Sequence, residues 1–328
     1  MNLAAKPRTH DTLNRRLRWA SPSTTATRIV PQEADFRLLE ALDCHGPLPA
    51  PYLFEFVKPF RSNYTGHQKR LCQLYNEART PHGGAYLTRP PQQNASFNAR
   101  YQPLTYDITR HGRAALAERG GLQRHVASRT DPMHHRFMNA CVTASIRLAA
   151  ERSGVDYIPE EAIIARDTCP DQTRRAKNPL AFRLSAKALV PDDLFGLGYP
   201  AESRRSFRFF ALEDDRGNES LERSDLAQTS YGGKLPLYLD ALRRRVFRDH
   251  WGIPNLFVMT VTTSNVRMEN MIEHLATLTR NEPKLRAHFL FKFRTDFAGH
   301  WSVPPVMHDL FDEPWQRAGA EPFRIDVP

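Results

Sequence analysis

Apolar residues recur at helical spacing in three segments near the N-terminal end of the chain. The pattern predicts helices over residues 33–45, 51–57 and 64–79, in which apolar positions three or four apart share one face. Two later segments, 83–91 and 101–109, are short and rich in aromatic and β-branched residues, which predicts a pair of strands. Three helices followed by a β-ribbon is the order of a winged helix-turn-helix domain, in which the third helix enters the DNA major groove.

The pattern changes at about residue 131. A long apolar helix is expected over 133–154, which ends at a glycine. Beyond it, strand-like and helix-like segments alternate, and this order predicts a mixed sheet flanked by helices. The expected strands cover residues 157–165, 181–195, 206–215, 254–263 and 288–297, and the expected helices cover 220–252 and 265–280. We therefore expect a two-domain chain of the α+β or α/β class.

Composition and charge sharpen this division. Of the 328 residues 41% are hydrophobic, which is enough for packed cores in two domains. The net charge is +10, and the charge is uneven: residues 1–130 hold 19 basic and nine acidic residues, whereas residues 131–328 hold 27 of each. We predict a flexible basic arm over residues 1–30, a DNA-binding domain over 31–125 and a second domain over 131–328. The basic first part favours a polyanionic partner, although a basic surface can also serve solubility alone.

The third helix carries the side chains expected to meet DNA. With its apolar residues facing inward, the polar ones stay outside, and glutamine, asparagine, lysine and arginine are the residue types that read bases and hold phosphates. A winged helix that binds protein is the alternative. The residues expected on the DNA-facing side are His67, Gln68, Lys69, Arg70, Gln73 and Asn76.

Two acidic clusters follow strongly apolar segments of the second domain. Asp192 ends one, and Glu213 and Asp215 end the next; because strand side chains alternate, Glu213 and Asp215 share a face and Asp214 points away. If the strands are neighbours, Asp192, Glu213 and Asp215 form one patch of hard oxygen ligands, which suits Mg²⁺ or Mn²⁺. Such an ion activates water for phosphodiester hydrolysis. The alternative is a set of turn carboxylates held by arginines, the candidates being Arg204, Arg205 and Arg216.

These short motifs resemble the replication-relaxation family of plasmid proteins. The resemblance covers about residues 33–300. It is carried by Pro191-Asp192, by Leu212-Glu213-Asp214-Asp215-Arg216-Gly217, by Lys234 with Tyr238, by Tyr106-Asp107-Ile108-Thr109-Arg110-His111-Gly112 with Leu116, and by His134 or His135. It implies a winged helix followed by a domain with a PD-(D/E)XK restriction-endonuclease-like core, and a role in plasmid replication, relaxation or mobilisation.

One position departs from the nuclease signature. Asp215 stands where that signature has a lysine, the residue that orients the attacking water and offsets negative charge. Lys234, on the following helix, is the candidate replacement, and its ammonium is then expected within ~4–6 Å of Asp215 or Glu213. The alternative is a domain that has lost catalysis and only binds DNA or metal. A tyrosine such as Tyr231 or Tyr238 could also form a covalent link to DNA, although tyrosines on such a helix usually serve packing.

The sequence thus predicts a Mg²⁺- or Mn²⁺-dependent DNA nickase whose catalytic residues are Asp192, Glu213, Asp215 and Lys234, the three carboxylates being metal ligands. Double-stranded DNA is the expected partner, together with other relaxosome or replication proteins. The alternative function is a catalytically inactive relaxosome accessory, copy-control factor or transcription regulator. No secretory signal or apolar run of ~20 residues is visible, so we expect a cytoplasmic protein without a membrane partner.

Overall fold

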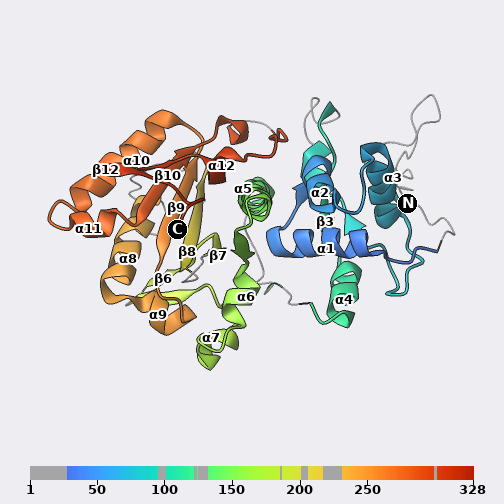
Figure 1. Ribbon diagram of the computed structural model, residues 1–328, viewed down its shortest axis with the longest axis horizontal. Helices are drawn as coiled ribbons and strands as arrows, with labels where there is room; N and C mark the ends of the chain where they lie inside the picture. The colour runs from blue at the N-terminus through green and yellow to red at the C-terminus, as the bar shows by residue number, and fades with distance from the viewer. Residues whose placement is uncertain are drawn as a thin grey trace, which may run out of the picture. The chain divides into compact units, whose positions relative to one another are not determined.

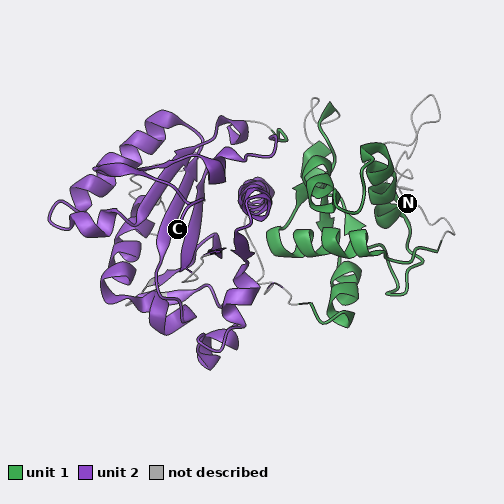
Figure 2. Cartoon of the chain, in the orientation of Figure 1, with its two compact units in different colours: residues 1–121, 301–303 green, residues 122–300, 304–328 purple. Residues whose placement is uncertain are grey.

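The computed structural model describes residues 28–94, 101–121, 124, 132–184, 187–200, 206–216, 231–298 and 301–328. Of the basic arm expected over residues 1–30, residues 1–27 lie outside these ranges. The chain divides into two compact units (Figure 2): residues 1–121 with 301–303, and residues 122–300 with 304–328.

Unit 1 combines four α-helices with a small sheet among its described residues. The helices are α1 (Glu33–His45), α2 (Ala50–Val57), α3 (Tyr64–Asn76) and α4 (Arg110–Glu118), with a 3-10 turn, η1 (Pro91–Asn94). The strands are β1 (Leu48–Pro49), β2 (Leu87–Thr88) and β3 (Thr105–Ile108), and β3 lies between the other two, antiparallel to both. The three helices and the ribbon expected from the sequence are therefore present, and the two-residue strand β1 was not anticipated.

Local chemistry sets the ends of these helices. The side chain of Asn63 accepts a hydrogen bond from the backbone N–H of Gly66 at the start of α3, and Thr109 caps α4 in the same manner. Helix α3 ends at Asn76, three residues earlier than expected, because Glu77 has an extended backbone. The helices then pack against the small sheet, and the side chains buried in this core include Leu38, Leu39, Leu42, Leu71, Leu74, Tyr106 and Ile108.

Unit 2 is built on a seven-stranded mixed sheet flanked by helices (Figure 1). The strand order is β12-β11-β10-β9-β8-β7-β4, in which β8, β9 and β10 are parallel and the remaining pairs are antiparallel. The strands are β4 (Asp156–Ile158), β7 (Asp193–Tyr199), β8 (Ser206–Asp215), β9 (Phe257–Thr262), β10 (Phe289–Phe293), β11 (Trp315–Arg317) and β12 (Ala320–Phe323). A separate hairpin is formed by β5 (Phe182–Leu184) and β6 (Lys187–Leu189).

Helices cover both faces of this sheet (Figure 1). On one face, α8 (Tyr231–Arg244) and α10 (Asn265–Leu278) close the main core over β8, β9 and β10. On the other lies α5 (Met133–Arg152), where Tyr157, Phe195 and Phe210 stack in a row. The shorter helices are α6 (Glu160–Ile164), α7 (Asp171–Arg174), α9 (Val246–Trp251), α11 (Pro283–Arg286), the 3-10 turn η3 (Thr295–Phe297) and α12 (Asp309–Asp312).

Four expectations for unit 2 are corrected. The segment 157–165 is not one strand, because Pro159 ends β4 and starts α6. The segment 181–195 divides into the β5–β6 hairpin and the start of β7. The described part of segment 220–252 is two helices, because Arg245 adopts a left-handed backbone with φ of 54° between α8 and α9. Strand β10 is not the last, since β11 and β12 add a hairpin at the sheet edge.

Candidate active site

The antiparallel pairing of β7 with β8 brings the two acidic clusters together. Asp193 pairs with Leu212, and the backbone N–H of Asp192 donates to the Leu212 carbonyl at 3.0 Å. Asp192 therefore lies at the start of β7, not at the end of a strand as the sequence suggested. Because the strands run in opposite directions, the start of β7 meets the end of β8, where Glu213 lies. The two acidic clusters are therefore close together, as expected, because β7 and β8 are antiparallel.

The alternation of side chains along β8 separates its three acidic residues. Phe209 and Ala211 belong to the core under α8 and α10, so Glu213 and Asp215 fall on that same face of the strand. Asp214 falls on the opposite face, toward α5. As expected, Glu213 and Asp215 therefore share one face of β8, and Asp214 lies on the other.

Lys234, from the first turns of α8, lies between two carboxylates. Its Nζ is 2.5 Å from Oε2 of Glu213 and 3.5 Å from Oδ1 of Asp192. The hydroxyl of Tyr238, one helical turn further along α8, donates to Oε1 of Glu213 at 2.5 Å. Lys234 thus points into the acidic site, close to Glu213 as expected, and both oxygens of Glu213 are held from α8.

Asp215 is paired differently. Its carboxylate accepts from Nε and Nη2 of Arg267, in the first turn of α10, with the Nη2–Oδ1 distance at 2.7 Å. The Thr262 hydroxyl donates to Oδ2 of Asp215 at 2.8 Å. Asp192 and Glu213 share Lys234 while Asp215 is held by Arg267, so the expected single patch of three carboxylates is divided in two. Within the described ranges, no three His, Cys, Asp or Glu side chains are arranged to hold a metal ion.

Of the three arginines considered for the carboxylates, Arg204 and Arg205 lie outside the described residues. Among the described arginines, Asp215 pairs with Arg267, which was not one of the candidates. Arg267 follows the next strand, β9, some fifty residues later in the chain. Only the parallel pairing of β8 with β9 could have indicated it, since both strands end at the same edge of the sheet.

Helix α5 reaches the same site from the opposite face of the sheet. Nε2 of His135 lies 3.2 Å from Oδ2 of Asp192, and the side-chain amide of Asn139 donates to the Asp192 backbone carbonyl at 3.0 Å. The carboxylate of Asp192 also accepts from the Asp214 backbone N–H at 2.8 Å. Asp192 is therefore fixed from both faces of the sheet, which sequence periodicity could not show.

Burial and charge act in opposite directions on these groups. Burial raises the pKa of Glu213 to about 7, even though Lys234 and Tyr238 favour its ionised form. Burial also opposes ionisation of Asp192, but Lys234 and His135 outweigh it and hold the pKa of this carboxyl well below its usual range. Burial likewise disfavours the charged form of Lys234, and Glu213 and Asp192 outweigh it, so the pKa of Lys234 lies above its usual value.

Asp214 is the least satisfied acid of the site. Its side chain is 6% exposed and neither carboxyl oxygen has a hydrogen-bond partner. Burial raises the pKa of Asp214 well above its usual value, and the nearby carboxylates of Asp192, Asp193 and Glu213 add to this effect. The raised pKa keeps Asp214 largely uncharged at neutral pH, so the negative charge of the site lies on Asp192 and, in part, on Glu213.

A buried arginine supports the start of β7. Arg124 contacts Oδ2 of Asp193 at 2.7 Å and Oε2 of Glu160 at 3.1 Å, and all three side chains are at most 6% exposed. Asp193 is thereby neutralised and directed away from Lys234. Of the adjacent pair Asp192-Asp193, only the first faces the site, and the sequence alone did not distinguish their roles.

In unit 1, α3 exposes only part of the set expected to face DNA. Gln68, Lys69 and Gln73 are exposed, and Asn76 is half-buried. The expectation that His67 lies outside is wrong: it is fully buried beside Phe54, and burial lowers its pKa to about 4. A histidine kept neutral fits this aromatic core, so His67 serves packing.

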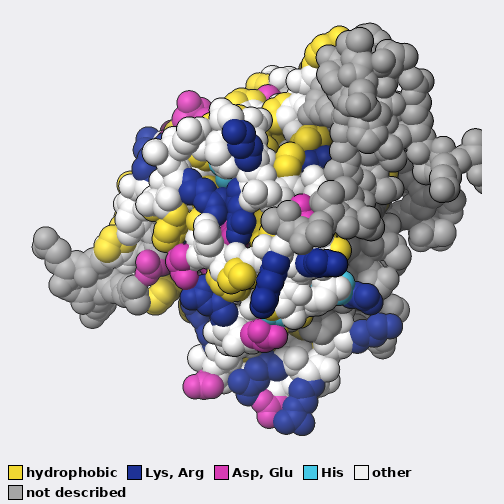
Figure 3. Space-filling model, turned by 90° about the vertical axis from the view of Figure 1, so that its right-hand side faces the viewer, with side chains coloured by type: hydrophobic (Ala, Val, Ile, Leu, Met, Phe, Trp, Pro, Cys, Tyr) yellow, Lys and Arg dark blue, Asp and Glu magenta, His cyan; other side chains and the backbone are white. Residues whose placement is uncertain are grey.

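Arg70 is also engaged within unit 1. Its guanidinium donates to Oδ2 of Asp35 at 2.6 Å and to the Val30 carbonyl at 2.9 Å, and Arg61 donates to the same Asp35 at 2.8 Å. Arg70 is thus half-buried in an ion pair between α3 and α1, instead of standing free on the surface. In Figure 3, which views the side of unit 1, Lys and Arg side chains are more frequent than Asp and Glu.

No protein-family model, curated protein or solved structure gives a significant match to this chain. The resemblance described above therefore depends on its short motifs, and function must be argued from the geometry of the two units.

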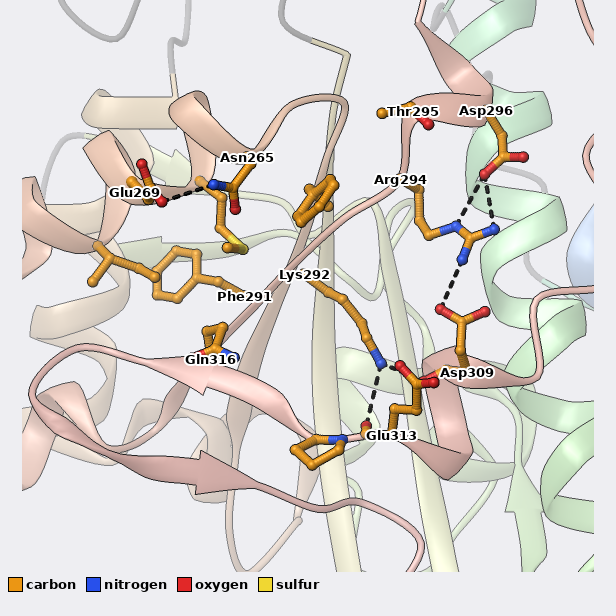
Figure 4. A pocket seen from close by; sticks show the side chains of 14 residues that line it. Asn265, Glu269, Phe291, Lys292, Arg294, Thr295, Asp296, Asp309, Glu313 and Gln316 are labelled. Carbon is orange, nitrogen blue, oxygen red and sulfur yellow. Dashed lines mark hydrogen bonds and ion pairs between the residues drawn. The ribbon is translucent and has the colours of Figure 1, made fainter.

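A cavity of about 730 Å³ lies at the ends of β10 and β11 (Figure 4). Several of its charged groups already have partners in the fold. Lys292 donates to the backbone carbonyls of Asp309 and Glu313, and Arg294 is held by Asp296 and Asp309. No helix in the described part of the chain has the length and apolar character needed to cross a bilayer.

Proposed function

We propose that this chain is a DNA-processing protein whose second unit cleaves one strand of DNA in a reaction that depends on a divalent cation. The observation that carries the proposal is the convergence of Asp192, Glu213 and Lys234 from β7, β8 and α8. Two carboxylates and a lysine directed at one point are the groups that phosphodiester hydrolysis requires: ligands for a cation, and a positive charge near the phosphate.

The donor set of the site fits Mg²⁺ or Mn²⁺. These ions prefer carboxylate oxygens, and Mg²⁺ is commonly held by one or two carboxylates with water completing its shell. Asp192 and Glu213 would hold the ion, since both already converge on the positive charge of Lys234. Asp215 is not placed among these ligands, because its carboxylate contacts Arg267 and Thr262, whereas Asp192 and Glu213 contact the same cation, Lys234. When bound, the ion would polarise a phosphoryl oxygen and lower the pKa of a water molecule.

The remaining residues of the site have roles of their own. Lys234 would offset negative charge that develops on the phosphate, and Tyr238 would fix the orientation of Glu213 through its hydrogen bond. Asn139 and the Asp214 backbone N–H would keep Asp192 in place. These contacts come from three elements, so the site is held rigid before substrate binds, which is a condition for transition-state stabilisation.

Unit 1 would bring the protein to duplex DNA as a winged helix. Its order of helix, strand, two helices and a two-stranded ribbon supports this interpretation, as does the exposure of Gln68, Lys69 and Gln73 on α3. The excess of basic residues before residue 131 agrees with a phosphate-rich partner. With the family resemblance, this suggests action in plasmid replication, relaxation or mobilisation alongside other proteins of that machinery.

A second candidate is a DNA-binding protein of the same fold that does not cleave. It is favoured by the ion pairs themselves, because Lys234 and Arg267 already neutralise part of the acidic charge without any metal. Such a protein would act as a relaxosome accessory, a copy-control factor or a transcription regulator.

Incubation of the full-length chain with supercoiled plasmid separates the two candidates. With Mg²⁺ or Mn²⁺ we expect conversion to the open circular form, and none with EDTA. Lys234→Ala should lower the rate roughly 10²–10³-fold, the cost of removing one group that stabilises a transition state. The control is Arg243→Ala, on the same helix α8 as Lys234. It breaks an exposed ion pair with Glu282 and should leave the rate unchanged. Equal rates for Lys234→Ala and the wild type would refute the catalytic role of Lys234, and a wild type inert with both metals would favour the second candidate.

A further inference from the structure

Arg267 is a cation at the acidic edge of the sheet in unit 2, and the proposed reaction gives it no role. It lies in the first turn of α10, and its side chain is 14% exposed. Two of its nitrogens, Nε and Nη2, donate to the two oxygens of Asp215, and Thr262 holds Asp215 in turn. A two-point contact of this kind fixes the plane of a guanidinium as well as its position.

The contact with Asp215 does not use the edge of the guanidinium that carries Nη1. Nη1 of Arg267 donates to none of the residues that the structure describes. Arg294, at the neighbouring end of β10, has a similar exposure of 20% but differs in this respect. Its Nε and Nη2 contact Asp296, and its Nη1 contacts Asp309 (Figure 4). Of these two oriented arginines at the same edge of the sheet, Arg267 is the one with an N–H group to offer.

The free edge is close to the acidic site. Asp215 follows Glu213 by two residues on the same face of β8, which is roughly 6.5–7 Å along a strand. Lys234 spends two of its three N–H groups on Asp192 and Glu213. A phosphodiester that approaches these carboxylates meets the negative charge of Asp192 beside a lysine that is already engaged, and Arg267 is an anchored cation close by that retains a donor for it.

We propose that Arg267 binds the phosphodiester at the cleavage site through Nη1, and that Asp215 is the positioning residue that orients it. This inference rests on the proposed function and specifies how its substrate is held. Asp215 is negatively charged at a position where the nuclease signature has a lysine. Because it binds Arg267 of α10, Asp215 nevertheless fixes a positive charge at this position. Arginine suits this task because it stays charged at any relevant pH and can bind a carboxylate on one edge and a phosphate on another.

The test uses the full-length chain with Arg267→Gln, with Arg294→Gln as the matched control. In the plasmid assay with Mg²⁺, Arg267→Gln should lower the single-turnover rate roughly 10²–10³-fold, and Arg294→Gln should leave it unchanged. In the second measurement, binding of a duplex oligonucleotide is followed with Ca²⁺ in place of Mg²⁺ over a range of salt concentrations. There the slope of log affinity against log salt should fall by about 1 for Arg267→Gln, because one phosphate contact is lost.

The outcomes separate this inference from the proposed function. A wild type that never cleaves would refute the nickase, while a reduced salt slope for Arg267→Gln would still support the phosphate contact. An unchanged slope would overturn the inference whether or not the wild type cleaves. If Arg267→Gln does not fold, Arg267→Lys decides. It keeps the charge but loses the two-point contact with Asp215, so the salt slope should be retained while the rate falls. A rate equal to that of the wild type would show that the orientation by Asp215 has no function.

Discussion

Each unit holds a group of buried charges, and the two groups are balanced in opposite ways. In unit 1, one carboxylate, Asp35, is paired with two arginines, Arg61 and Arg70, which tie α3 and the segment before it to α1. In unit 2, two carboxylates, Asp192 and Glu213, share one lysine. In the first group, two largely buried arginines face one carboxylate. In the second, three carboxyl groups face Lys234 and His135, and the third of them, Asp214, has no hydrogen-bond partner for either oxygen among the described residues.

This difference distinguishes the group that stabilises the fold from the group that is arranged to bind a partner. A structural ion pair places its buried charge against an excess of donors, as Asp35 does. A buried carboxylate costs stability unless a cation joins it, and burial is the main cause of the raised pKa of Glu213, to which the charge of Asp192 adds. Proteins keep such unfavourable arrangements mainly at sites where chemistry or binding depends on them.

The largest expected effect concerns the structural group. Asp35→Ala leaves Arg61 and Arg70 without their shared carboxylate and should lower the free energy of unfolding by about 3–5 kcal/mol, as expected when one partner of a buried pair is removed. Urea denaturation would measure it. Glu33→Ala is the control on the same helix, and loss of its exposed pair with Arg119 should cost less than about 1 kcal/mol. Equal effects of the two variants would contradict a structural role for Asp35.

The next effect concerns pH and the functional group. The pKa of Glu213 is about 7 in the folded chain against a usual value of 4.5, so the folded state binds this proton more tightly than the unfolded state. The contribution of Glu213 to stability is therefore complete below pH 4.5 and is lost as the pH rises through 7. In EDTA, the free energy of unfolding of Glu213→Gln should fall less than that of the wild type over this window. Parallel curves would show that Glu213 is not protonated preferentially in the folded state.

A smaller effect distinguishes the exposed part of α3 from its buried part. Lys69→Ala in the full-length chain should weaken duplex binding by roughly 1–3 kcal/mol if Lys69 contacts a base, or lower the salt slope by about 1 if it contacts a phosphate. Lys58→Ala, at the end of α2, removes an exposed lysine paired with Glu55 and is the control. Binding by Lys69→Ala that equals the wild type in affinity and slope would remove α3 from the DNA-binding surface.

Some of this organisation could be predicted from the sequence because it depends on local pattern. Alternation along 206–215 was sufficient to separate Glu213 from Asp214, and the lysine after the strand was sufficient to indicate Lys234. The strand β7 was concealed by Asp192-Asp193, which suggests a turn, and by Gly196. That glycine is needed because a Cβ there would meet the ring of Phe209 at 2.9 Å.

The parts that could not be predicted depend on partners far apart in the chain. Arg267 reaches Asp215 only because β8 and β9 are parallel neighbours, and Arg124 neutralises Asp193 across 69 residues. His67 and Arg70 have the residue types of a DNA-contacting surface, yet aromatic packing and the charge of Asp35 draw them inward. Residue type and helical spacing cannot separate an exposed polar residue from one with a buried partner.

Asp192 and Glu213 should together hold a divalent cation. The melting temperature with and without Mn²⁺ reports this binding, since an ion that binds only the folded state raises that temperature by mass action. We expect a rise for the wild type, a rise for the control Asp240→Asn on the same helix as Lys234, and none for Asp192→Asn. A rise of equal size in Asp192→Asn, or none in the wild type, would contradict it.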